Sequence, residues 1–112
     1  MVPDVVSKDA LLARLGGDAA LLGAMAALFL EEYPRYLAGI RDAVVRHDAR
    51  ELERTAHGLK GSVSNFMASE SAQAAQALET MGRAGSLAHA EQALAELEAA
   101  LGRLRPVLES FR

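Results

Sequence analysis

Apolar residues recur along the chain with a helical period, and polar breaks divide that pattern into segments. The longest segment runs from Leu21 to Val44, where apolar positions are spaced three or four residues apart and charged residues fall mostly between them. The pattern predicts a short helix over about 8–15 and longer helices over about 18–47, 48–66, 69–82 and 86–104.

The residues at the ends of these segments predict how the helices begin and stop. The expected N-terminal caps are, in order, Ser7 or Asp9, Asp18, Asp48, Ser69 and Ser86. Pro34 predicts a kink or a break inside the second helix, and Pro106 predicts the end of the fifth. Because the connections are short, neighbouring helices should be antiparallel. We therefore expect a single all-α domain over 1–112, an up-and-down antiparallel four-helix bundle with the short N-terminal helix across one end.

Composition and charge narrow the classes of function. The chain is 51% hydrophobic and has a formal net charge of -3, so it lacks the basic face that binds nucleic acid. It has no cysteine, which excludes disulfides and thiolate chemistry. Its longest uncharged stretch is well short of the roughly 20 residues that cross a bilayer. We expect a cytoplasmic protein that binds neither nucleic acid nor membranes.

The third predicted helix carries the candidate chemistry. On a helical wheel of about 100° per residue, its apolar residues form one stripe, and His57 lies on the opposite face, pointing at solvent. Lys60, Gly61 and Ser64 share the face of His57. A histidine in a helical bundle is commonly a buried core residue, and the position of His57 on the wheel, opposite the apolar stripe, makes that role improbable. A surface histidine without a role remains the simpler alternative.

Two glycines and a rare lysine favour a functional histidine. Gly58 and Gly61 lie inside the helix, where glycine costs about 1 kcal/mol relative to alanine. Bare backbone at Gly61, one turn beyond His57, would give another protein a flat surface on which to land. Lys60 is one of only two lysines in the chain, and its mobile ammonium suits a phosphoryl oxygen that changes position. Together these residues describe a histidine that can carry a negatively charged group.

Residues 57–62, His-Gly-Leu-Lys-Gly-Ser, resemble the His-x-Leu-Lys-Gly-Ser motif of histidine-containing phosphotransfer (HPt) domains, and the flanking helices resemble that family over nearly the whole chain. The resemblance implies that His57 accepts a phosphoryl group from the aspartyl phosphate of a receiver domain and relays it to another receiver. It also implies that Lys60 steadies the phosphoryl oxygens and that Gly61 allows the receiver to approach. Ser64, on the same face, is a candidate hydrogen-bonding neighbour.

The same resemblance implies the cofactors and partners. The partners would be receiver domains of response regulators and a hybrid histidine kinase, and the protein would act as a monomer. It would hold no cofactor or metal of its own, because Mg²⁺ would be bound by the receiver. The sequence has no glycine-rich nucleotide loop, so we expect a phosphotransfer intermediate without ATP-dependent kinase activity, and not an enzyme in its own right.

One alternative function and several residues stay open at this stage. A helical module or inhibitor that docks on a receiver or a histidine kinase, without carrying phosphate, would use the same surface. His47 is expected to be a charge at a helix C-terminus and His89 a surface residue, and neither has metal-ligand spacing. Glu53 and Arg54 are expected to be solvated contacts for a partner. Met67 replaces the glycine usual in the family, so we expect this helix to end differently.

Overall fold

The computed structural model describes residues 6–112, which form five helices and no strand. The helices are α1 (Lys8–Arg14), α2 (Ala19–Arg46), α3 (Ala49–Ser64), α4 (Ser69–Ala84) and α5 (Ala90–Glu109). The all-α class predicted from the apolar pattern is confirmed for this part of the chain. The first five residues of the predicted domain lie outside the described residues.

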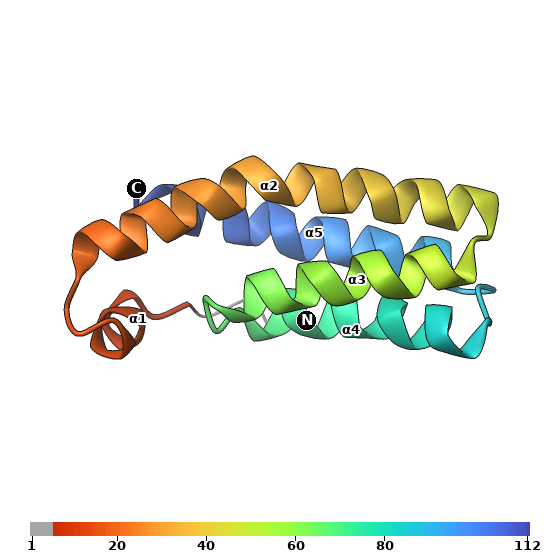
Figure 1. The fold of residues 1–112 in the computed structure, drawn as a ribbon, viewed down its shortest axis with the longest axis horizontal. Helices are drawn as coiled ribbons and strands as arrows, with labels where there is room; N and C mark the ends of the chain where they lie inside the picture. Colours follow the sequence, from red (N-terminus) through yellow and green to blue (C-terminus); the bar gives the residue numbers. More distant parts are fainter. Residues whose placement is uncertain (1–5) are drawn as a thin grey trace.

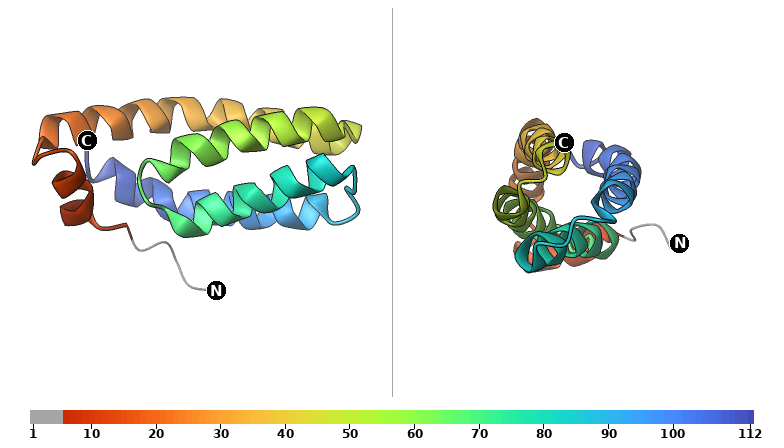
Figure 2. Two further views of the ribbon diagram at one scale, coloured as in Figure 1. Left: turned by 60° about the horizontal axis from the view of Figure 1, so that its bottom comes forward. Right: turned by 90° about the vertical axis from the view of Figure 1, so that its right-hand side faces the viewer.

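The four long helices lie along the longest axis of the molecule (Figure 1). Helix α2 packs against α3 and α5, and α4 packs against the same two helices, so each long helix has two neighbours. The end-on view shows the four arranged around a common centre (Figure 2). Between α1 and α2 the chain turns by 110°, which lays α1 across one end, where its Leu11 is buried.

The core between the helices decides which face of α3 is turned to solvent. The buried residues of α3 are Leu52, Ala56, Leu59 and Val63. The ring of Phe66 closes the core just beyond the helix and meets Phe29 of α2 edge-on, with the ring centroids 5.5 Å apart. The polar face of α3 is therefore held outward along its whole length, as its helical wheel predicts.

Local capping explains where the first three helices begin. Ser7, Asp18 and Asp48 each accept a hydrogen bond from the backbone N–H three residues later, at 3.1, 2.9 and 3.1 Å. Each bond satisfies a backbone donor that has no partner within its helix. The caps predicted for these helices are confirmed, with Ser7 and not Asp9 serving α1.

The caps predicted for the last two helices are wrong. Ser69 is the first residue of α4, and the buried Ala68 before it provides no side-chain hydrogen bond. Ser86 does not begin α5 either, because the chain crosses from α4 to α5 through residues 86–89 and the helix starts at Ala90. At α4 the buried Ala68 occupies the capping position, and at α5 Ser86 lies four residues before the first helical residue.

Neither proline ends its helix. Helix α2 runs through Pro34 without a break, and α5 continues through Pro106 to Glu109 instead of stopping near Leu104. Proline removes one backbone hydrogen bond of a helix. In α5 the loss is offset because Leu108, beyond Pro106, is fully buried in the core.

Candidate functional site

His57 lies in the middle of α3 on its outward face. Its side chain is 67% exposed, which agrees with the orientation predicted from the sequence. Gly61 is also exposed, whereas Lys60 is half-buried because its side chain lies against α4. The predicted site residues therefore share one face, but Lys60 is more constrained than the sequence suggested.

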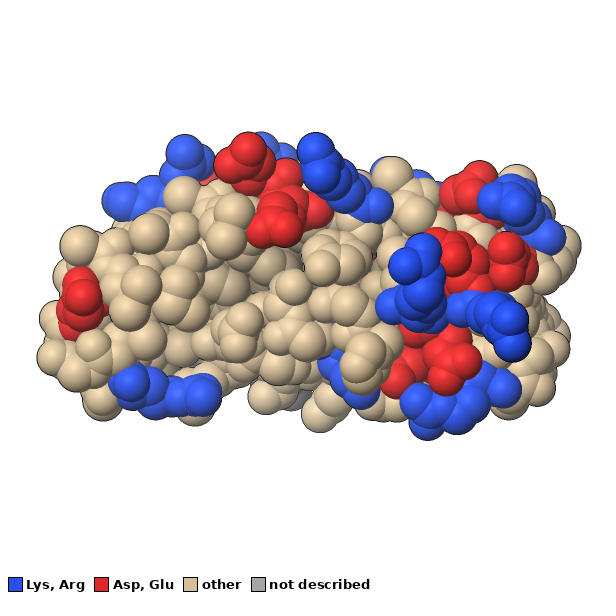
Figure 3. All heavy atoms as spheres, viewed as in Figure 1, with Lys and Arg blue, Asp and Glu red and all other residues tan. Residues whose placement is uncertain are grey.

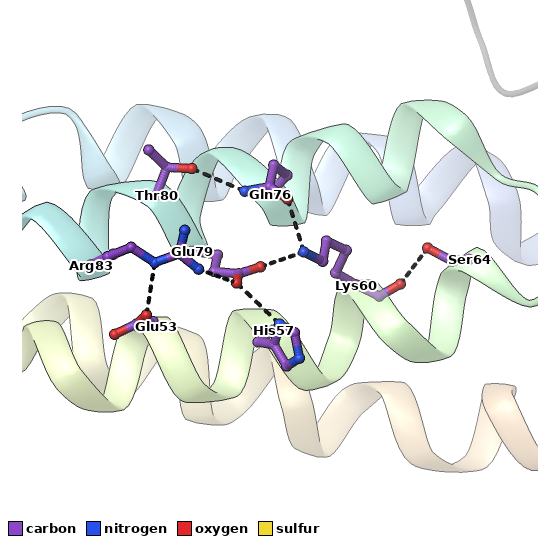
Figure 4. A network of polar contacts seen from close by, with 8 residues as sticks. All are labelled: Glu53, His57, Lys60, Ser64, Gln76, Glu79, Thr80 and Arg83. Atoms are coloured by element: carbon purple, nitrogen blue, oxygen red, sulfur yellow. Dashed lines mark hydrogen bonds and ion pairs between the residues drawn. The ribbon is translucent and has the colours of Figure 1, made fainter.

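A buried carboxylate from α4, which the sequence analysis did not single out, lies directly beside His57. Glu79 is only 2% exposed, and its Oε2 atom is 3.0 Å from Nδ1 of His57. The same carboxylate contacts Lys60 Nζ at 2.8 Å through Oε1 and an Arg83 guanidinium nitrogen at 2.8 Å through Oε2. Figure 4 shows Glu79 at the centre of this group, with its three partners around it.

The charge of Glu79 decides which nitrogen of the neutral His57 ring carries the proton. The pKa of Glu79 is lowered, chiefly by the hydrogen bond from Lys60 and also by His57, against the opposing effect of burial. An ionised carboxylate can only accept hydrogen bonds, so the proton of neutral His57 must reside on Nδ1. The lone pair of the neutral ring is then on Nε2, which points away from Glu79 in Figure 4.

Lys60 is also bound by a side chain one turn earlier on α4. Its ammonium donates to Oε1 of Gln76 at 2.9 Å. The amide nitrogen of Gln76 in turn donates to the hydroxyl of Thr80 at 3.0 Å. The Lys60 ammonium is thus shared between Gln76 and Glu79.

Arg83 of α4 binds Glu79 as well as a carboxylate of α3. It donates to Glu53 of α3 at 3.0 Å as well as to Glu79, so it joins the two helices. Arg54 instead pairs with Glu51 on its own helix, at 2.7 Å. Glu53 is therefore part of the polar network beside His57, and Arg54 is not.

Three glycines control how closely other groups approach this site. A Cβ atom on Gly61 would meet nothing within 4 Å, so its backbone is open to a partner. A Cβ atom on Gly58 would lie 2.7 Å from the ring of Tyr36, so this glycine is explained by packing within the protein. A Cβ atom on Gly82 would lie 2.6 Å from the backbone nitrogen of Glu53, so Gly82 allows the close contact of α3 and α4.

The family model of the Hpt domain matches residues 24–106, a span that contains the whole of this site. The chain belongs to the Hpt domain family. No curated protein and no solved structure gives a significant match. Hpt domains are phosphotransfer modules of phosphorelays, not kinases, and they interact with receiver domains. The family suspected from residues 57–62 is therefore confirmed.

Met67 follows α3, at the position where the sequence analysis expects a departure from the glycine of the family. Met67 has a left-handed backbone with φ of 57°, a conformation that glycine adopts without strain and methionine does not. The side chain of Met67 therefore sits on a left-handed turn of the kind that glycine favours. Ser64, one of the predicted site residues, donates its hydroxyl to the backbone oxygen of Lys60 at 2.6 Å, a hydrogen bond within α3 itself.

The other two histidines lie away from the site. His47 caps the C-terminus of α2 in a left-handed conformation with φ of 55°, and His89 precedes α5 on the surface. Within residues 6–112 no group of three or more His, Cys, Asp or Glu side chains is placed to hold a metal ion. Over the same residues no single helix is long and apolar enough to span a membrane, and only α1 and α2 taken together as a bent pair reach that length and composition.

The sequence did contain a signal for Glu79. The buried positions of α4 are Ser71, Ala75, Leu78, Glu79 and Gly82, and these share one helical stripe. A carboxylate in such a stripe needs partners, because burying an unpaired charge is very unfavourable. The helical wheel of α4, drawn as for α3, would have marked Glu79.

Proposed function

We propose that this Hpt domain accepts a phosphoryl group on Nε2 of His57 from a receiver-domain aspartyl phosphate and relays it to an aspartate of another receiver. The observation that carries the proposal is the pairing of an exposed histidine with a buried, ionised carboxylate. Glu79 holds the ring through Nδ1 and leaves Nε2 as the nucleophile facing solvent.

The proposed transfer needs no side chain of this domain to donate or accept a proton. The lone pair of Nε2 forms a bond to phosphorus while the bond from phosphorus to the aspartyl oxygen breaks, and the aspartate leaves as a carboxylate. The proton stays on Nδ1, so the phosphorylated ring is cationic and its charge faces the Glu79 carboxylate. The reverse sequence delivers the group to the next receiver. Glu79 therefore orients the ring and stabilises the charge that forms on it.

Lys60 and Gly61 have different roles in the same transfer step. The Lys60 ammonium is on the next turn of the helix from His57 and supplies positive charge for the phosphoryl oxygens. Gly61 leaves the backbone bare, so a receiver can bring its aspartate in line with Nε2. Mg²⁺ is assigned to the receiver, and this domain holds no cofactor of its own in the proposal.

The proposed docking surface covers α2 and α3 beside His57. Charged side chains gather toward the right-hand end of the face in Figure 3, and the left-hand part is mostly uncharged. The exposed large apolar side chains of the protein include Leu28 and Met67, which are 56% and 45% exposed. Met25, Leu28 and Asn65 help to line a shallow groove of about 110 Å³ between the two helices. A transient receiver interface of roughly 1,000 to 1,600 Å² would cover this surface.

The proposal also includes the scaffold. We take residues 1–112 as one domain in which the four long helices form an up-and-down antiparallel bundle. Short connections and the packing of each long helix on two neighbours support this arrangement. The domain acts as a monomer between receivers and a hybrid histidine kinase, in the cytoplasm.

The test incubates the protein with a phosphorylated receiver domain and Mg²⁺. We expect label that is labile in acid and stable in base, placed on Nε2 of His57 by nitrogen-15 NMR, and no label in a His57→Gln variant. Label that never forms with any receiver, or that persists in His57→Gln, would contradict the proposal and favour the alternative of a docking module that carries no phosphate.

The role of Gly61 has its own test. In Gly61→Arg we expect transfer from the receiver to fall at least about 100-fold, because the side chain occupies the approach of a bulky partner. Direct labelling of His57 by phosphoramidate, a small donor, should change little. Equal losses with both donors would show that Gly61 does not serve receiver access.

A further inference from the structure

Lys60 is bound on α4 and does not lie free beside the nucleophilic nitrogen. Its Nζ atom is 2.9 Å from Oε1 of Gln76 and 2.8 Å from Oε1 of Glu79, and only 27% of its side chain is exposed. Figure 4 shows the ammonium directed at these two oxygens, whereas the Nε2 side of His57 points away from them. The ammonium is therefore held on the α4 side of the site, away from Nε2.

The Gln76 amide also bonds to a third side chain, Thr80 of α4. The Gln76 amide nitrogen donates to the Thr80 hydroxyl at 3.0 Å, while the amide oxygen accepts from Lys60. Rotating the amide by half a turn would place its NH₂ group against the ammonium and lose the bond to Lys60, because an ammonium can only donate, whereas the Thr80 hydroxyl can donate as well as accept. Gln76 therefore offers Lys60 a fixed acceptor.

We propose that Gln76 is a positioning residue that holds the Lys60 ammonium on α4 while His57 is unphosphorylated, and that Lys60 exchanges Gln76 for a phosphoryl oxygen when the group arrives. The proposal rests on the proposed function, because it concerns the phosphorylated state of the same histidine. An ammonium has three donors, so Lys60 can keep Glu79 while it releases Gln76. An anionic phosphoryl oxygen is a stronger acceptor than a neutral amide, which favours the exchange.

The first part of the test observes the lysines directly and needs no phosphate. The chain has only two lysines, so nitrogen-15 NMR of the side-chain ammonium groups gives one signal from Lys60 and one from the exposed Lys8 as an internal control. We expect the Lys60 ammonium to be more ordered than that of Lys8, and Gln76→Met to reduce its order. A Lys60 ammonium as mobile as that of Lys8 would overturn the proposal, whatever the outcome of phosphorylation.

The second part measures phosphorylation by phosphoramidate, so that no receiver is involved. In this reaction the P–N bond of the donor breaks, ammonia leaves, and Nε2 of His57 forms the new bond to phosphorus. In Gln76→Met, Lys60 no longer has to give up the amide oxygen, so we expect labelling to be about three- to tenfold faster, the equivalent of one hydrogen bond. Gln73→Met, at an exposed position of α4, is the matched control and should label at the wild-type rate.

A Lys60→Met background separates positioning from other effects. If Gln76 acts through Lys60, Gln76→Met has no further effect on the rate once Lys60 is replaced. A rate that Gln76→Met leaves unchanged or lowers, or raises equally in the Lys60→Met background, overturns the proposal. If no variant forms phosphohistidine, the proposed function fails and the exchange of Lys60 fails with it, while the ammonium signals still decide separately whether Gln76 holds Lys60.

Discussion

Replacing Gly82 with alanine should destabilise the domain, although alanine is the better helix former. A Cβ atom at this position would lie 2.6 Å from the backbone nitrogen of Glu53 and 2.7 Å from the backbone oxygen of Ala49. Ordinary contact begins near 3.4 Å, so α3 and α4 would have to separate locally by roughly 0.8 Å. Neither contact can be relieved by a side-chain rotation, because both atoms belong to the backbone.

The magnitude follows from two opposing effects. Overpacking of this kind costs up to about 3 kcal/mol, and a clash with backbone justifies the upper end. The better helix propensity of alanine returns about 1 kcal/mol. We therefore expect Gly82→Ala to lose about 2 kcal/mol, which lowers the Tm by about 8 °C for a domain of this size.

The control is Gly102→Ala in α5. A Cβ atom there would meet nothing within 4 Å, so only the propensity effect applies. We expect a gain of about 0.5 to 1 kcal/mol and a Tm about 2 to 4 °C higher. Thermal and urea unfolding followed by far-UV circular dichroism measure both variants. If Gly82→Ala were as stable as the wild type, or were stabilised like Gly102→Ala, the close approach of α3 and α4 would not be what requires glycine.

Two further predictions concern single side chains. Met67→Gly should stabilise the domain by about 0.5 to 1 kcal/mol in urea unfolding, because glycine relieves the strain of the left-handed backbone. Met67→Ala keeps a Cβ atom at this position and should give no such gain. Stabilisation by both variants would show that the methionine side chain, and not the backbone conformation, is the cause. Because the pKa of Glu79 is lowered on folding, its contribution to stability is complete above its ordinary pKa of about 4.5 and is lost as the pH falls through the lower folded value. The free energy of unfolding of the wild type should therefore be about 1 kcal/mol higher than that of Glu79→Gln at neutral pH, after allowance for the partly exposed partners. This difference should shrink below about pH 4.5, and a difference that grows in acid would refute the reasoning.

The parts of the fold that could be predicted are those decided within one turn of helix. Asp18 and Asp48 each bond to a backbone N–H three residues later, so their residue type and position are sufficient to place the helix start. Ser69 is also a residue type that commonly caps helices, but the chain enters α4 from the buried Ala68. Pro106 fails as a stop signal for a similar reason, since a local preference against helix is weaker than the burial of the last turn of α5.

The candidate site also has features that one helix decides and features that depend on how two helices pack. The face shared by His57 and Gly61 is a property of one helix, so the sequence alone predicts it. The partner of Nδ1 depends on how α3 and α4 are placed against one another, with their close contact at Gly82, and the sequence of α3 alone does not mark this. A wheel of α4 can identify Glu79 as a buried charge that needs partners, but it cannot say that the partners are His57 and Lys60.

Burying the Glu79 carboxylate costs folding free energy, and this cost indicates that the residue serves the chemistry of the site. An apolar residue at this position would complete the buried stripe of α4, and replacing a buried ion pair with apolar side chains is often neutral or stabilising. The carboxylate instead fixes the tautomer of His57 and draws Lys60 onto α4. Both effects concern the chemistry of an exposed imidazole and add little to the core. A bundle selected for stability alone has no need of them, whereas the proposed phosphotransfer function requires a ring that presents Nε2 to its partner.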